Sequence, residues 1–146
     1  MDIEDRLAIE DLYARYCVTL DTGDEAGWVA CFSPHGVFSG RSPARGRAEL
    51  VGYHRDRMAA RAEEPFTNPQ HWNANLQLSG EPPEVAGFSY VMRIGTMRAD
   101  GSIRIVRLAA YRDRLVKQDG RWLFARRDVS FEPVPHAEIF KEPGEK

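Results

Sequence analysis

The second half of the chain contains four long segments with the composition of β-strands, and this pattern restricts the fold more than any other feature. The segments are rich in β-branched and aromatic residues and lie at roughly 70–79, 84–97, 102–118 and 121–132. The turn sequences "SGEPPE", "ADG" and "QDG" separate them. Because ADG and QDG are typical hairpin connections, we expect consecutive strands to be antiparallel neighbours in one sheet.

The first half of the chain has helical periodicity. Asp2 can cap a first helix and Asp24 a short second one, with Gly23 ending the first helix between them. A strand is expected at 36–40, a loop at 42–46, and a third helix at 47–63. In the first helix, apolar residues at steps of three to five predict one buried stripe: Ile3, Leu7, Leu12, Tyr16 and Leu20.

Three helices followed by an antiparallel meander predict an α+β fold in which the helices pack on a strongly curved, mostly antiparallel β-sheet. Such a sheet forms a cone, and a cone that side chains do not fill is a pocket. The length suits a single domain over 1–146, with a core at about 5–132 and a Pro-interrupted tail at 133–146. This tail, which carries His136, could close over the pocket as a lid.

Composition and charge argue against several classes of partner. The formal net charge is -2, from 20 basic and 22 acidic residues, so there is no basic excess for nucleic acid. Six arginines between positions 41 and 61 alternate with acidic residues, which predicts a mixed, solvated face. No apolar run approaches the ~20 residues that span a membrane. The acidic, amphipathic start is unlike a secretory or transit sequence, so we expect a cytoplasmic protein.

The cysteines give no sign of a disulfide framework or of a metal site. Cys17 and Cys31 are the two cysteines of the chain, with no CxxC motif and no histidine at ligand spacing. We therefore expect two reduced thiols packed in the core.

The stretch "NPQHWNAN" places a histidine in a predicted strand. His71, Asn73 and Asn75 occupy alternate positions and should share one polar face, while the residues between them face the other way. A strand histidine without further context is more often structural than catalytic. His54 is expected to be exposed.

Three longer stretches carry a resemblance to a known family. "DLYARYCVTLDTGDEAGWVACFSPHGVFSG", "HWNANLQLSGEPPEVAGFSYVM" and "AAYRDRLVKQDGRWLFARRDV" together resemble the SnoaL-like branch of the nuclear transport factor 2-like (NTF2-like) superfamily over about residues 5–132. This branch includes scytalone dehydratase, bile acid 7α-dehydratase, hexachlorocyclohexane dehydrochlorinase and the small subunits of ring-hydroxylating dioxygenases. The resemblance implies the NTF2-like cone, three N-terminal helices on a curved sheet.

The resemblance also implies a catalytic pair. In the eliminating enzymes an aspartate at the end of the first helix and a histidine on the following long strand form a dyad, and Asp21 and His71 occupy those positions. His71 would be the base, and Asp21 would orient it and stabilise its protonated form. Tyr16 matches a pocket tyrosine five residues before the aspartate. Arg127 matches an arginine late in the last strand, with Arg126 as the alternative.

Proton removal from carbon leaves negative charge that needs hydrogen-bond donors. The candidate substrate-binding residues are therefore Tyr16, Asn75, Tyr111 and Arg127. Two of them also have structural interpretations, because Tyr16 can be a core tyrosine and Arg127 can pair with Asp113. This chemistry requires no metal and no organic cofactor.

These residues predict a cofactor-independent lyase or isomerase, dehydratase-like, that acts on a small, largely apolar, cyclic substrate. Two alternatives stay open: a non-catalytic assembly subunit and a small-molecule-binding protein. An enclosed cavity with His71 and Asp21 in contact would favour the enzyme, and a filled cone with a large apolar sheet face would favour the assembly subunit. The family also implies a homo-oligomer, a dimer or a trimer.

Overall fold

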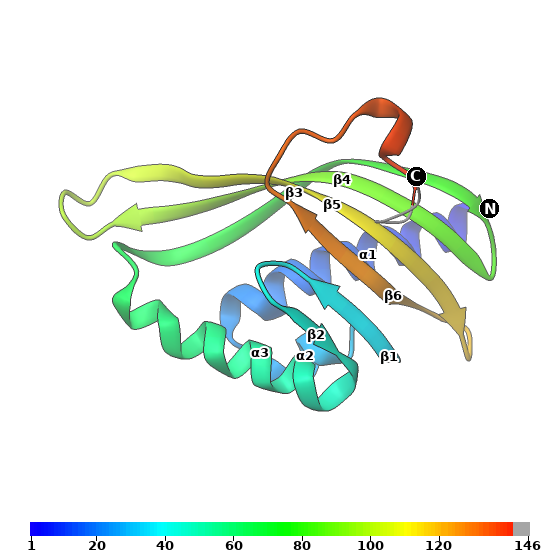
Figure 1. Ribbon diagram of the computed structural model, residues 1–146, viewed down its shortest axis with the longest axis horizontal. Helices are drawn as coiled ribbons and strands as arrows, with labels where there is room; N and C mark the ends of the chain where they lie inside the picture. The colour runs from blue at the N-terminus through cyan, green and yellow to red at the C-terminus, as the bar shows by residue number, and fades with distance from the viewer. Residues whose placement is uncertain (142–146) are drawn as a thin grey trace.

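The computed structural model describes residues 1–141 of the 146-residue chain (Figure 1). Helices occupy most of the first half and four long strands the second half, as the sequence predicts. The elements are α1 (Ile3–Thr22), α2 (Glu25–Val29), β1 (Phe32–Ser39), β2 (Pro43–Arg45), α3 (Gly46–Ala60), η1 (Arg61–Glu63), β3 (Phe66–Glu81), β4 (Glu84–Met97), β5 (Ile103–Gln118), β6 (Arg121–Ser130) and η2 (His136–Glu138).

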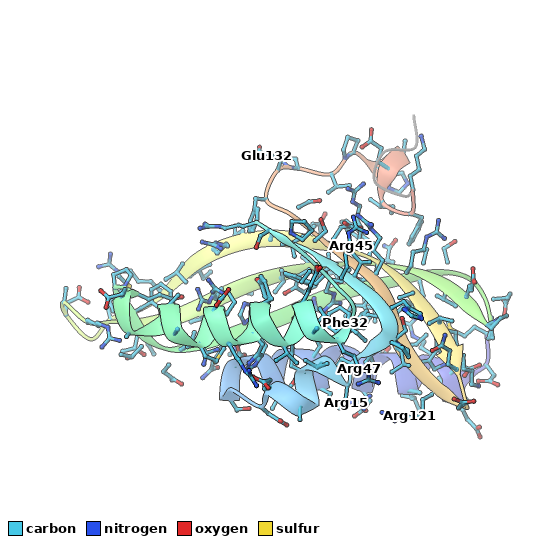
Figure 2. The ribbon with its side chains drawn as sticks, turned by 60° about the horizontal axis from the view of Figure 1, so that its bottom comes forward. Arg15, Phe32, Arg45, Arg47, Arg121 and Glu132 are labelled. Atoms are coloured by element: carbon cyan, nitrogen blue, oxygen red, sulfur yellow. The ribbon has the colours of Figure 1, made fainter. Side chains whose placement is uncertain are left out.

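One six-stranded sheet, in the order β2-β1-β6-β5-β4-β3, forms the framework. All neighbours are antiparallel except β1 and β6, which are parallel. The three α-helices lie on one side of the sheet and the C-terminal segment lies on the other (Figure 1). Figure 2 brings the helical side forward, with α3 and α1 in front of the sheet. The predicted α+β fold is therefore confirmed.

The sheet curves where its strands lose register. Irregularities interrupt the ladder between Ala74 and Gln77 on β3, at Arg93/Ile94 on β4, and at Arg114/Leu115 on β5. An extra residue on one strand bends that strand and increases its twist. Three such positions on long neighbouring strands let the sheet wrap around the helices.

Helix α1 is capped as the sequence predicts, but the predicted stripe is only partly right. The Asp2 side chain accepts the backbone N–H of Asp5 at 2.8 Å, and Gly23 ends the helix with φ 78. Ile3 and Leu7 are exposed. Each helical residue turns ~100°, so Leu7 lies ~200° around the helix from the buried Ile9 and faces solvent. The buried face is Ile9, Leu12, Tyr13, Tyr16 and Leu20.

Aromatic rings fill the space between the helices and the inner face of the sheet. Trp28 of α2 lies 5.1 Å from Phe32 of β1, and Phe32 lies 5.7 Å from Phe124 of β6, measured between ring centroids. Phe32 is visible among these packed side chains in Figure 2. Cys17 and Cys31 are both buried and free, which confirms the prediction for the thiols.

The C-terminal segment packs on the outer face of the sheet. Ile139 forms a small buried cluster with Phe88 and Ala110. These strand residues face away from the helices, so the described part of the tail cannot close over a pocket on the helical side. The predicted lid is wrong for residues 133–141.

Within residues 1–141, none of the helices has the length and apolar character needed to cross a membrane.

Candidate active site

A cavity of about 500 Å³ lies between the helices and the inner face of the sheet. Its apolar lining comes from several elements, including Leu20 of α1, Phe38 of β1, Met58 of α3, Val91 of β4 and Val129 of β6. The cone is therefore not filled by side chains. A volume of this size is typical of small-molecule sites, which range over about 300–1,000 Å³.

His71 and Asp21 are in hydrogen-bond contact beside this cavity. His71 Nδ1 lies 2.6 Å from Asp21 Oδ1, and the backbone N–H of His71 donates to Asp21 Oδ2 at 2.7 Å. Both side chains are 14% exposed. Since a carboxylate accepts hydrogen bonds, Nδ1 carries the proton, and Nε2 is left as the basic nitrogen. His71 itself lines the cavity.

Arg61 holds the end of α1 that carries Asp21. Its guanidinium donates to the backbone oxygens of Leu20 and Asp21, both at 2.7 Å. The last carbonyls of a helix have no partner within the helix, so these two bonds satisfy groups that would otherwise be left open. Arg61 also lines the cavity. It therefore fixes the backbone from which the Asp21 carboxylate extends.

Tyr16 and Tyr111 are buried and line the cavity. Their ring centroids lie 5.9 Å apart in an edge-to-face arrangement. Burial raises the pKa of both hydroxyls well above the ordinary tyrosine value, and the nearby Arg127 cation opposes this only in part. Both side chains therefore stay protonated and can donate hydrogen bonds. The structure brings these two predicted residues to the same cavity as His71.

Arg127 is in the core and does not line the cavity. Its Nε and Nη2 donate to the two oxygens of Asp113 at 2.8 and 2.7 Å, and the side chain is fully buried. The hydroxyl of Tyr13 donates to the same carboxylate at 2.5 Å. Of the two interpretations of Arg127, the structure therefore supports the ion pair with Asp113. Arg126 instead pairs with Asp128 at 2.7 Å and is also absent from the cavity lining.

Asn75 is also separated from the cavity, because strand β3 bulges next to it. Its backbone adopts a left-handed φ of 59, and its side chain is exposed. The bulge breaks the alternation that would have placed it on the same face as His71. It borders a second hollow of about 420 Å³ beside α1 instead, which His71 also lines. Asn73 donates to Ser89 Oγ and to the Tyr90 carbonyl, both at 2.9 Å.

Several arginines at the cavity were not predicted as site residues. Arg93 and Arg107 line it from β4 and β5. Arg41, Arg57 and Arg61 line it as well, although the charge pattern of this stretch predicts a solvated face. Side chains alternate along a strand, so the inward positions can be predicted only if the register is known. The bulges shift the register, and the sequence does not indicate where they occur.

His54 is buried rather than exposed, which corrects the expectation. Its side chain is 1% accessible and lies 5.6 Å from the Trp28 ring. Burial lowers its pKa below the ordinary histidine value. Within residues 1–141 its Nε2 has no hydrogen-bond partner. The same part of the chain contains no group of three or more His, Cys, Asp or Glu side chains placed to hold a metal ion.

A curved sheet that carries helices on one face, with a cavity between sheet and helices, is typical of the NTF2-like class of folds. Within this class, the chain belongs to the SnoaL-like family, because the model of the SnoaL-like domain matches residues 1–128. This confirms the resemblance inferred from the sequence. None of the curated proteins matches the chain.

Solved structures agree on the fold. A Mycobacterium tuberculosis protein of unknown function is 30% identical with a TM-score of 0.76, and the match covers 89% of this chain and 73% of that one. An NTF2-like protein with a cystatin-like fold from Novosphingobium aromaticivorans is 20% identical with a TM-score of 0.78, covering 92% and 86%. A scytalone dehydratase-like protein from the same organism is 23% identical with a TM-score of 0.72, covering 91% of each chain. The last two similarities, at 20% and 23% identity, show only that the fold is shared.

Proposed function

We propose that this protein is a cofactor-independent lyase or isomerase that removes a proton from carbon in a small cyclic substrate. The observation that carries the proposal is the contact between His71 and Asp21 beside a cavity of about 500 Å³. An imidazole held by a carboxylate in the correct tautomer is a general base near neutral pH. A base without a cavity, or a cavity without a base, would not support this chemistry.

The proposed reaction uses the polar groups that lie at the cavity. Nε2 of His71 takes a proton from a carbon next to a carbonyl, and the Asp21 carboxylate stabilises the imidazolium that forms. The electron pair of the broken C–H bond moves toward the carbonyl oxygen, where the Tyr16 and Tyr111 hydroxyls can donate hydrogen bonds. In an elimination, the pair then forms a C=C bond as a neighbouring C–O bond breaks. The imidazolium returns its proton to the leaving hydroxyl as water, or to another carbon in an isomerisation.

The assembly-subunit alternative has one observation in its favour. The outer face of the sheet exposes large apolar side chains, with Trp72 55%, Tyr90 58% and Leu108 68% accessible. Such a patch is typical of an interaction surface. We propose that it mediates homo-oligomerisation of the enzyme, because an assembly role alone gives no reason for the cavity and the paired imidazole.

The test is turnover with a panel of cyclic hydroxy-ketones and ketones, followed by the absorbance of the conjugated product. His71→Ala should lower the rate at least a hundredfold, since a positioned base contributes about 10²–10⁴-fold. The exposed His35 on β1 provides a matched control, and His35→Ala should keep wild-type activity. Circular dichroism checks that both variants fold. A wild-type rate in His71→Ala would reject the proposal.

A further inference from the structure

A row of three polar side chains crosses the inner face of the sheet. His71 on β3 is paired in register with Arg93 on β4, and Arg93 is paired with Arg107 on β5. All three line the cavity. Neighbouring strands are ~4.8 Å apart, so the backbone of Arg107 lies roughly 10 Å from that of His71. A small ring can span this separation.

The two arginines of the row differ in how their charge is compensated. Arg93 Nη2 donates to both carboxylate oxygens of Glu64, at 3.0 and 2.8 Å. For Arg107, residues 1–141 supply no carboxylate within ion-pair distance. Burial, together with the cations of Arg41, Arg93 and Arg57, lowers the pKa of its guanidinium, and the Glu64 carboxylate opposes this only in part. Arg107 is therefore a partly buried cation that no carboxylate of the described chain pairs with directly.

The surrounding lining carries more positive than negative charge. Five arginines line the cavity, against two carboxylates, Glu49 and Asp56. Both carboxylates are exposed, and Glu49 accepts the backbone N–H of Arg45 at 2.7 Å. Arg57 pairs at 3.5 Å with Glu64, the partner of Arg93, and Arg61 is engaged with the end of α1. The excess positive charge is concentrated at the end of the row away from His71.

Phe131 supports the cationic end of the cavity. The guanidinium carbon of Arg107 lies 5.2 Å from the centre of its ring, and that of Arg41 lies 5.9 Å from the same centre. Cations at this distance over an aromatic ring are attracted to it. The ring therefore attracts both arginines without neutralising them.

We propose that the cavity binds a cyclic carboxylate, with Arg107 binding the carboxylate and Arg41 adding to the positive field. This inference rests on the proposed function and names the substrate class. An uncompensated, partly buried charge is unfavourable until a counter-ion arrives, and the planar guanidinium matches a carboxylate with two parallel hydrogen bonds. The ring of the substrate lies along the row, and its acidic carbon reaches His71.

Calorimetric titration with naphthoate and its neutral isostere naphthamide tests this inference. Wild type should bind naphthoate at least about tenfold tighter than naphthamide, because a hydrogen-bonded charge pair contributes at this level. Arg107→Gln should abolish the preference by weakening naphthoate only. Arg104→Gln is the matched control, since Arg104 is on the same strand, exposed and paired with Asp100, and it should keep the preference.

Arg41→Gln provides a second test, because Arg41 is exposed and its loss cannot unfold the core. This variant should reduce the preference several-fold. Equal affinity of the two probes for wild type, no binding of either, or an undiminished preference in a folded Arg107→Gln protein would overturn the inference. Binding needs no turnover, so a charge preference that persists while His71→Ala retains full activity would contradict the proposed function and not the carboxylate site.

Discussion

Both carboxylate oxygens of Asp21 contact His71. Oδ1 contacts the ring Nδ1, and Oδ2 accepts the backbone N–H. One oxygen fixes the tautomer, and the other fixes the strand that carries the ring. The pair therefore joins the end of α1 to the edge strand β3. A single carboxylate sets both the chemistry of the imidazole and its position.

The burial of His54 predicts that the stability of the protein depends on pH. Burial lowers its pKa from an ordinary value of 6.5, so the folded protein keeps it neutral while the unfolded chain binds a proton. Below about pH 6.5 the unfolded state holds more protons, and the free energy of unfolding falls as the pH drops toward the folded pKa. In urea titrations between pH 7 and 5, His54→Phe should show a shallower decline than wild type.

The exposed His136 is the control for this effect, and His136→Phe should keep the wild-type slope. Identical slopes for wild type and His54→Phe would show that burial of His54 does not contribute. The sequence could not predict this burial, because His54 faces Trp28, a residue of another helix.

At the scale of elements, the end of α1 depends on Arg61. Arg61→Gln removes two charge-assisted hydrogen bonds to helix carbonyls and should lower the free energy of unfolding by about 1–3 kcal/mol. It should also lower kcat, because Asp21 is then held less firmly. The exposed Arg55, paired with Glu25, is the control. Arg55→Gln should change stability by no more than about 0.5 kcal/mol. Equal effects of the two variants on both stability and kcat would refute the positioning role.

The helices and strands were predictable because their signals are local. Asp2 and Asp24 cap helices as their positions indicate, and the ADG and QDG turns connect the expected strands. The bulge beside Asn75 carries no such signal, and it moved that residue away from the cavity. Arg127 was ambiguous for another reason, since its partner Asp113 lies on a neighbouring strand whose register the sequence does not give.

At the scale of the whole molecule, the outer face of the sheet predicts self-association. Trp72, Met92 and Leu108 are paired in register on three adjacent strands and form one apolar row. We expect a dimer or trimer by light scattering after size-exclusion chromatography. Leu108→Lys should shift the mass to that of a monomer, because it places a charge in the buried interface. Leu7→Lys, the same substitution at an exposed position of α1, should keep the oligomer. A monomeric wild type would contradict this prediction.

Family membership and the dyad positions came from the order of motifs along the whole chain, whereas the arginines at the cavity emerge only from the folded sheet. Arg93 and Arg107 meet His71 because three strands align in one register. The proposed substrate class thus rests on the assembled fold.

The most direct measurement of the central claim is solvent deuterium incorporation next to the carbonyl of cyclic ketones, followed by proton NMR in D₂O. Wild type should accelerate the exchange, His71→Gln should reduce it about a hundredfold or more, and Asp21→Asn should reduce it substantially with the fold retained. Exchange that proceeds equally fast with wild type and His71→Gln would contradict a catalytic role for the pair.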